Sequence, residues 1–141
     1  MAFIFPGLEW TQEVQRICNA DPEFKEAVQD FNGKMMFHIE ADEKIDKSVC
    51  LFLDIADAQV KEAAEYADMK DRPDTDYILS AKYTQWKEVI TGQLEPLRAI
   101  MTRKMKLVKG SQLKMLKYVK FTLKMMDVTK AVDSDFSLEK K

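Results

Sequence analysis

Residues 86–126 read WKEVITGQLEPLRAIMTRKMKLVKGSQLKMLKYVKFTLKMM, and the order of structural signals in this segment restricts the fold strongly. A short amphipathic helix is predicted to end at Gly92, because glycine commonly follows the last turn of a helix. Pro96 suits the first turn of a second short helix, and the alternation over residues 105–109 predicts a strand. Two short helices therefore cross from one strand to the next, and a closing helix follows Gly110.

The closing helix, expected from Ser111 to about Asp127, has a wide apolar face. At 100° per residue, its apolar side chains fill an arc of about 180°, while its lysines cluster on the opposite side. That arc is wider than packing against one sheet requires. The arc contains Met115, Leu116, Tyr118, Val119, Leu123, Met125 and Met126, and the lysines are Lys114, Lys117, Lys120 and Lys124.

The earlier residues predict two helices and most of a sheet. Apolar stripes favour helices over residues 8–19 and 22–31, and period-two alternation predicts a hairpin over residues 34–55. The second strand of this hairpin is apolar on nearly both sides, so the sheet should be covered on both faces there. Residues 58–67 are ambiguous, because their alanine and glutamate favour helix while their alternation also fits a strand. A short strand is expected at residues 77–81.

A chain of 141 residues can bury its own core, so we expect one domain over residues 1–141. Its parts would be N-terminal helices at residues 8–31, a core at residues 34–127, and a polar tail at residues 128–141 that frays beyond Phe136.

Charge is distributed unevenly along the chain. Residues 98–126 carry nine basic and no acidic side chains, whereas residues 1–97 have a net charge of −10 and residues 127–141 of −1. The asymmetry indicates an anionic partner, or internal neutralisation of a basic segment by acidic loops. Nucleic acid is disfavoured, because most aromatic residues lie on apolar stripes and the acidic remainder would repel a polyanion.

A lipid fits this composition better. It needs a broad apolar wall for its tail and can use cations near its head group or near an anionic membrane. The nine methionines could form an adaptable lining for such a tail. They could equally be ordinary core residues.

Catalytic and metal-binding patterns are not recognisable in the sequence. His38 is the only histidine, and no glycine-rich phosphate loop or nucleophile motif is present. Cys18 and Cys50 are expected to be buried thiols rather than a zinc site or a disulfide. We therefore predict no enzymatic activity, no cofactor and no metal. The first residues do not resemble a secretory signal and no apolar run could span a bilayer, so a cytoplasmic location is expected.

The segment YILSAKYTQWKEVITGQLEPLRAIM (residues 77–101), followed by RKMKLVKGS (residues 103–111), resembles the sterol carrier protein type 2 family. In that family an aromatic-containing helix, a Gly-x-Leu/Met-x-Pro turn, a second short helix, a strand and a closing helix follow in this order. The words NADPEF (residues 19–24) and the strand from Gly33 are similar to stand-alone prokaryotic-type members with an N-terminal helical extension. The resemblance covers about residues 8–127.

The resemblance implies an α+β fold: a five-stranded, mostly antiparallel sheet covered by helices, with a hydrophobic tunnel between sheet and helices. It also favours a strand at residues 58–67. Carried over by position, the tunnel lining would be Trp86, Val89, Ile90, Leu94, Leu97, Ile100, Met101, Met105, Leu113, Leu116, Val119 and Leu123. The side chains expected to attract an anionic head group or membrane are Arg98, Arg103, Lys104, Lys114 and Lys117.

We therefore predict non-enzymatic binding, and intracellular transfer, of a fatty acid, fatty acyl-CoA, sterol-like lipid or phospholipid, with transient contact to an anionic membrane and none to nucleic acid. The alternative is a protein-interaction or dimerisation module without a ligand cavity, in which residues 86–126 dock a partner or a second copy. A third hypothesis is an accessory domain that supplies a hydrophobic substrate to an enzyme on a separate chain. The oligomeric state stays open, and a dimer is one of its forms.

Overall fold

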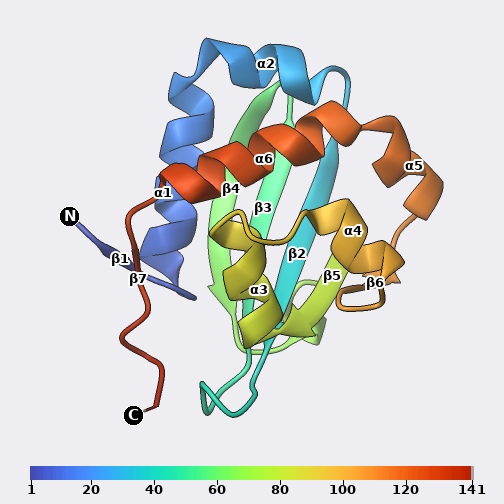
Figure 1. The fold of residues 1–141 in the computed structure, drawn as a ribbon. Helices are drawn as coiled ribbons and strands as arrows, with labels where there is room; N and C mark the ends of the chain where they lie inside the picture. The colour runs from blue at the N-terminus through green and yellow to red at the C-terminus, as the bar shows by residue number, and fades with distance from the viewer. Residues whose placement is uncertain (141) are drawn as a thin grey trace.

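Five strands form the central sheet, in the order β4-β3-β2-β5-β6, in a computed structural model that describes residues 1–140 (Figure 1). β2 and β5 run parallel, and the other three neighbouring pairs are antiparallel. The predicted α+β fold with a mostly antiparallel five-stranded sheet is thus confirmed. The strands are β2 (Gly33–Glu40), β3 (Val49–Ala56), β4 (Gln59–Tyr66), β5 (Tyr77–Lys82) and β6 (Lys106–Lys109).

The segment with ambiguous propensity, residues 58–67, contains the edge strand β4. It pairs with β3 through a two-residue turn in which Asp57 and Ala58 both have positive φ, as in the tight turns that match the strand twist. The side chain of Asn19 then holds the edge: its amide donates to the Val60 carbonyl at 3.0 Å and its carbonyl accepts from the Val60 N–H at 2.8 Å. Tertiary pairing therefore overrides local helix propensity here.

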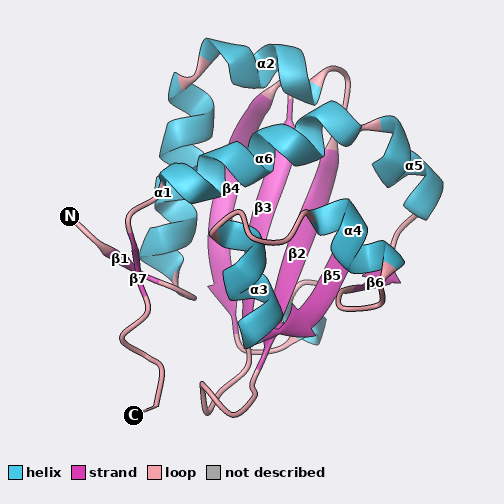
Figure 2. Cartoon of the chain, in the orientation of Figure 1, coloured by secondary structure: helices cyan, strands magenta, loops and turns pink. Residues whose placement is uncertain are grey.

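Helices cover one face of the sheet (Figure 2). That face presents Met35, Leu53 and Leu79 to a core shared with the longer helices. The helices are α1 (Leu8–Ala20), α2 (Pro22–Val28), α3 (Tyr83–Ile90), α4 (Pro96–Met101), α5 (Gln112–Lys117) and α6 (Val119–Ala131).

The opposite face of the sheet carries a second, smaller cluster. Phe52 and Cys50 are fully buried there beneath the segment that follows β4, which includes the short helix η1 (Met69–Asp71). The guanidinium of Arg72 lies 4.2 Å from the centre of the Phe52 ring and is fixed by Glu62 at 3.0 Å. β3 is therefore covered on both sides, as its apolar sequence predicted.

The prediction of one continuous closing helix is wrong. The chain forms α5 and α6 instead, with a break at Tyr118, whose φ and ψ of −102° and 41° lie outside the helical region. The Tyr118 ring packs edge-on against Phe31 with centroids 5.0 Å apart, and its hydroxyl donates to Asp30 at 3.1 Å. These contacts hold the break.

The C-terminal residues are also better ordered than expected. α6 continues to Ala131, and β7 (Ser134–Asp135) pairs in parallel with β1 (Phe3–Ile4). Beyond Phe136, Glu139 accepts from the Tyr83 hydroxyl at 2.8 Å and pairs with Lys87 at 2.5 Å. Residues 128–140 therefore close against the N-terminal segment and α3 rather than fraying.

Candidate functional site: an apolar cavity between sheet and helices

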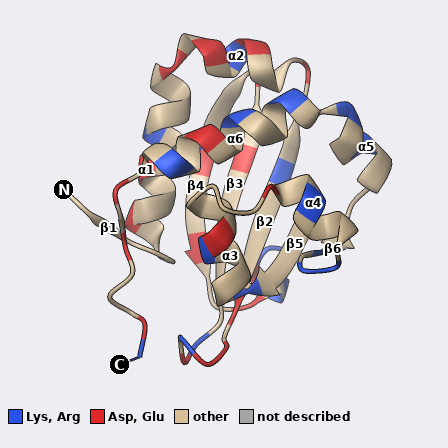
Figure 3. Cartoon of the chain, in the orientation of Figure 1, with Lys and Arg blue, Asp and Glu red and all other residues tan. Residues whose placement is uncertain are grey.

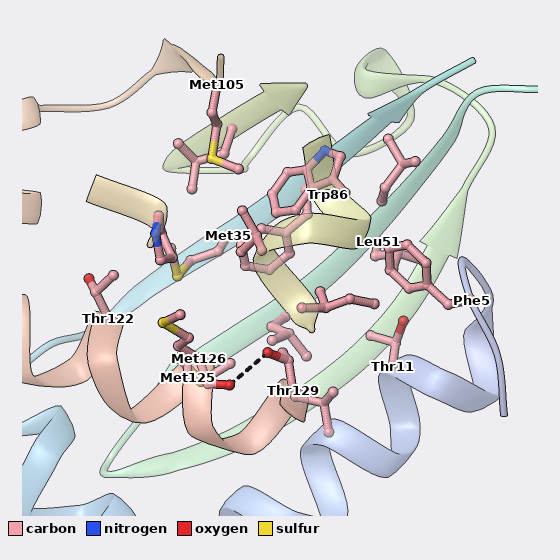
Figure 4. Close-up of a pocket in the computed structure, with 18 of the residues that line it drawn as sticks. Phe5, Thr11, Met35, Leu51, Trp86, Met105, Thr122, Met125, Met126 and Thr129 are labelled. Carbon is pink, nitrogen blue, oxygen red and sulfur yellow. Dashed lines mark hydrogen bonds between the residues drawn. The ribbon is translucent and has the colours of Figure 1, made fainter. Parts of the chain in front are cut away.

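An apolar cavity of about 100 Å³ lies between the helix-covered face of the sheet and the helices. Figure 4 shows side chains from α1, α6 and the strands pointing into it. The strands provide Met35, Phe37, Ile39, Leu51, Leu53 and Leu79, and the helices and their flanks provide Phe5, Trp10, Thr11, Val14, Trp86, Val89, Ile90, Pro96, Met105, Met115, Phe121, Thr122, Met125, Met126 and Thr129.

Polar groups at this lining are already engaged within the protein. The hydroxyls of Thr11 and Thr129 donate to the carbonyls of Gly7 and Met126, each at 2.9 Å. The indole N–H of Trp86 donates to the carbonyl of His38 at 2.8 Å. No charged residue of the described chain lines the cavity. Such a wall can hold a ligand by dispersion contacts and by removing its apolar surface from water, but it provides few directional polar contacts.

Ionisable groups next to the cavity stay neutral at ordinary pH. Burial raises the pKa of the Cys18 thiol to about 12, and its sulfur lies 3.9 Å from that of Met125 in the cavity wall. Burial, and then the bond to Glu139, raises the pKa of Tyr83 as well. Among residues 1–140, no group of three His, Cys, Asp or Glu side chains is arranged to hold a metal ion.

Aromatic side chains bound the cavity at two ends. At one end the ring of Phe5 packs edge-on against Trp10, with centroids 4.8 Å apart. At the α5 end, Phe121 stacks on Phe31 at 4.9 Å, and a second void of about 10 Å³ adjoins it. Because Phe121 lines both voids, its ring forms part of the wall between them.

Four of the twelve predicted lining residues reach the cavity: Trp86, Val89, Ile90 and Met105. Leu94 is buried in the core but does not line it, and the half-buried Leu97 and Ile100 also lie outside its wall. The other five are exposed on α4, α5 and α6, so their assignment to the wall is corrected: these are Met101, Leu113, Leu116, Val119 and Leu123.

The width of the predicted arc explains the two misplaced residues of α6, Val119 and Leu123. With α6 starting afresh at Val119, its inward side is Phe121, Thr122, Met125, Met126 and Thr129 at helical spacing, and Leu123 points outward. The two threonines are polar residues that an arc built on hydrophobicity left out. The strand contribution was also missed, although the alternation in residues 34–55 already separated Met35, Phe37 and Ile39 from the other side of the sheet.

The five predicted head-group residues, Arg98, Arg103, Lys104, Lys114 and Lys117, are all exposed. Figure 3 shows basic segments on α4, α5 and the neighbouring part of α6. Of the nine basic residues in 98–126, only Lys124 has an ion-pair partner within residues 1–140; it contacts Asp21 at 2.5 Å. The basic charge of this region is therefore mostly presented to solvent.

No helix in the described chain is both long enough and apolar enough to cross a bilayer.

Comparisons with known proteins place these features in a family context. Residues 14–122 match the model of the SCP-2 sterol transfer family. A crystal structure of sterol carrier protein 2 is 24% identical, with a TM-score of 0.81, covering 89% of this chain and 97% of that chain. A conserved hypothetical protein from Thermus thermophilus, described as possibly a sterol carrier protein, is 24% identical with a TM-score of 0.82, covering 94% and 92%.

Sterol carrier protein 2 from Yarrowia lipolytica, in its apo form, is more distant at 16% identity and a TM-score of 0.55, with coverage of 89% and 95%. A comparison with curated protein sequences gave no significant match. The structural likenesses agree with the observed sheet order and helix placement, and the family match covers well over half of the chain. The chain therefore belongs to the SCP-2 sterol transfer family.

Proposed function

We propose that this protein binds one lipid through its acyl chain in the cavity between sheet and helices, and that it carries or presents this lipid without catalysing a reaction. The observation that supports the proposal is the apolar cavity, whose wall contains no charged side chain among residues 1–140. Family membership supports it further, because the SCP-2 fold is one of lipid binding and transfer. The alternative of an interaction module supposed that no cavity exists, and the cavity disfavours it.

The size of the cavity limits what enters without rearrangement. At ~10–15 Å³ for each water-sized group, about 100 Å³ has room for roughly seven to ten such groups. That is a short acyl segment, so a longer chain requires the wall to give way. Flexible Met115, Met125 and Met126 in the wall are suited to this, because unbranched thioether side chains repack easily.

The basic residues Arg98, Arg103, Lys104, Lys114 and Lys117 are proposed to attract the anionic head group of the ligand. They are exposed, and none lines the cavity, so their contribution is long-range attraction rather than a buried ion pair. Salt should therefore weaken it. Affinity would come mainly from the tail, at ~0.8 kcal/mol for each buried methylene.

Delipidated protein titrated with a fluorescent fatty acid tests the proposal. We expect saturable binding that unlabelled fatty acids displace, with a carboxylate preferred over its neutral methyl ester at low salt. Native mass spectrometry of freshly purified protein should reveal a bound mass of a few hundred daltons. Absence of saturable displacement, together with a ligand-free dimer in the mass spectrum, would favour the interaction module instead.

A further inference from the structure

We propose that α5 is a gate that inserts into an anionic lipid bilayer and, in doing so, opens the cavity. This inference rests on the proposed function, because it assigns an entry route to the same cavity. It starts from how α5 is attached. Of its six residues only Met115 is buried, and Met115 is part of the cavity wall.

The attachment of α5 is weak for physical reasons. A helix of six residues is too short to be stable alone, so its position depends on the packing of that one side chain. Its two flanks are anchored, Gly110 against the ring of Tyr77 and Tyr118 by Phe31 and Asp30, so between these anchors Met115 is the one buried side chain that holds the helix. Displacing α5 outward would withdraw Met115 and open the wall at this end.

Several solvent-exposed positions on α5 and near it carry large apolar side chains, although polar side chains are more common at such positions. Leu113 is 80% exposed, Met101 73% and Leu116 46%. Figure 1 places α4 and α5 in one region at the edge of the molecule, joined in the chain through β6. A region of this kind needs an apolar partner.

Charge identifies that partner as an anionic lipid surface. Arg98 lies on α4, Arg103 and Lys104 follow it, and Lys114 and Lys117 lie on α5; none of the five has an ion-pair partner within residues 1–140. Basic residues beside a bilayer rich in anionic lipid add to its attraction, and leucines between them can enter the interface. A second copy of the chain is a poorer partner, because face-to-face contact would bring two basic surfaces together.

Vesicle binding tests the docking step. We expect wild-type protein to bind phosphatidylcholine vesicles containing phosphatidylserine, and pure phosphatidylcholine vesicles at least about tenfold more weakly. The double variant Leu113→Gln, Leu116→Gln changes exposed residues only and should lose at least about tenfold in affinity for the anionic vesicles. The matched control Leu8→Gln, Leu138→Gln replaces leucines that are 39% and 49% exposed elsewhere, and it should bind like the wild type.

Ligand exchange tests the gating step. Both native cysteines are buried, so a fluorophore on Leu113→Cys reports on α5 alone. Its emission should shift to the blue with anionic vesicles, and the same vesicles should speed release of a bound fluorescent fatty acid several-fold in the wild type and not in the double variant. The double variant should keep wild-type affinity for monomeric fatty acid in solution.

Three results would overturn the inference: unchanged vesicle binding by the double variant, equal loss in the control, or a wild-type dimer in solution that the double variant dissociates. The two proposals fail separately. If fatty acid binds but vesicles change neither the emission nor the release rate, the gate is wrong and the lipid-binding proposal stands. If vesicles bind but no fatty acid is taken up, the lipid-binding proposal is wrong.

Discussion

Replacing Thr129 by phenylalanine should weaken ligand binding strongly while the protein still folds. Thr129 is half-buried on α6 and its side chain points into the cavity (Figure 4). An empty apolar void costs ~24 cal/mol per Å³, so about 100 Å³ costs about 2.4 kcal/mol, the most that filling can recover. Crowding by the ring costs ~1–3 kcal/mol, so the free energy of unfolding should rise by at most about 1.4 kcal/mol or fall by at most about 3 kcal/mol.

Binding should weaken strongly. If the ring displaces only three methylenes of the ligand, the loss is ~2.4 kcal/mol, or about 60-fold in Kd. Displacement of a fluorescent fatty acid measures Kd, and urea unfolding measures stability. Val119→Phe, on the outward side of the same helix, is the control and should bind like the wild type. A Thr129→Phe variant that folds normally and binds with unchanged Kd would refute the cavity as the binding site.

Three further predictions concern stability. Gly110→Ala should lower the free energy of unfolding by about 2–4 kcal/mol in urea titration, because its Cβ would lie 2.5 Å from the Cδ1 of Tyr77 at a φ of +112°; a neutral result would contradict the close approach. Phe121→Ala should cost ~3–5 kcal/mol, and because it merges two voids, fatty acid should raise its Tm more than that of the wild type; an equal shift would count against this. Lys87, the main donor to Glu139, holds the pKa of that carboxyl below its ordinary value of 4.5. The contact between the Glu139 carboxylate and Lys87 therefore stabilises the fold fully above pH 4.5, and this contribution is lost as pH falls through the lowered pKa. The Tm of Glu139→Gln should therefore fall less steeply than that of the wild type below about pH 4.5, and parallel curves would show that the contact is unimportant.

The fold could be predicted from the sequence where local and tertiary preferences agree. Pro22 and Pro96 do begin helices, and Gly92 does follow one. The strand expected at residues 58–67, observed as β4, was predicted only through the family resemblance, because its alanines and glutamates favour helix. What decides it is pairing with β3 and the two hydrogen bonds from Asn19, which connect residues 41 positions apart. Such long-range contacts leave no local pattern.

The site was less predictable because hydrophobicity alone set the width and centre of the helical arc. The arc included Met115 and Met125, which line the cavity, but it was wide enough to include Leu123, which is exposed on the other side of α6. The break between α5 and α6 depends on Tyr118 meeting Phe31 and Asp30, residues almost ninety positions earlier. Thr122 and Thr129 were missed for another reason: a helical threonine can satisfy its own hydroxyl on the preceding turn, so it lines an apolar wall at little cost.

A cavity in the middle of a small domain lowers stability unless a ligand fills it or other packing offsets its cost. The cost of about 2.4 kcal/mol is a large part of a typical net stability of ~5–15 kcal/mol. The aromatic groups at its two ends can offset it, since pairs such as Phe5 with Trp10 and Phe31 with Phe121 each contribute ~0.5–1.5 kcal/mol beyond burial. The wall between these ends, in contrast, includes flexible methionines and the weakly held α5. Rigid ends and an adaptable wall allow the void to expand around a ligand without unfolding the domain, and they place the expansion beside α5, where the exposed leucines and lysines lie.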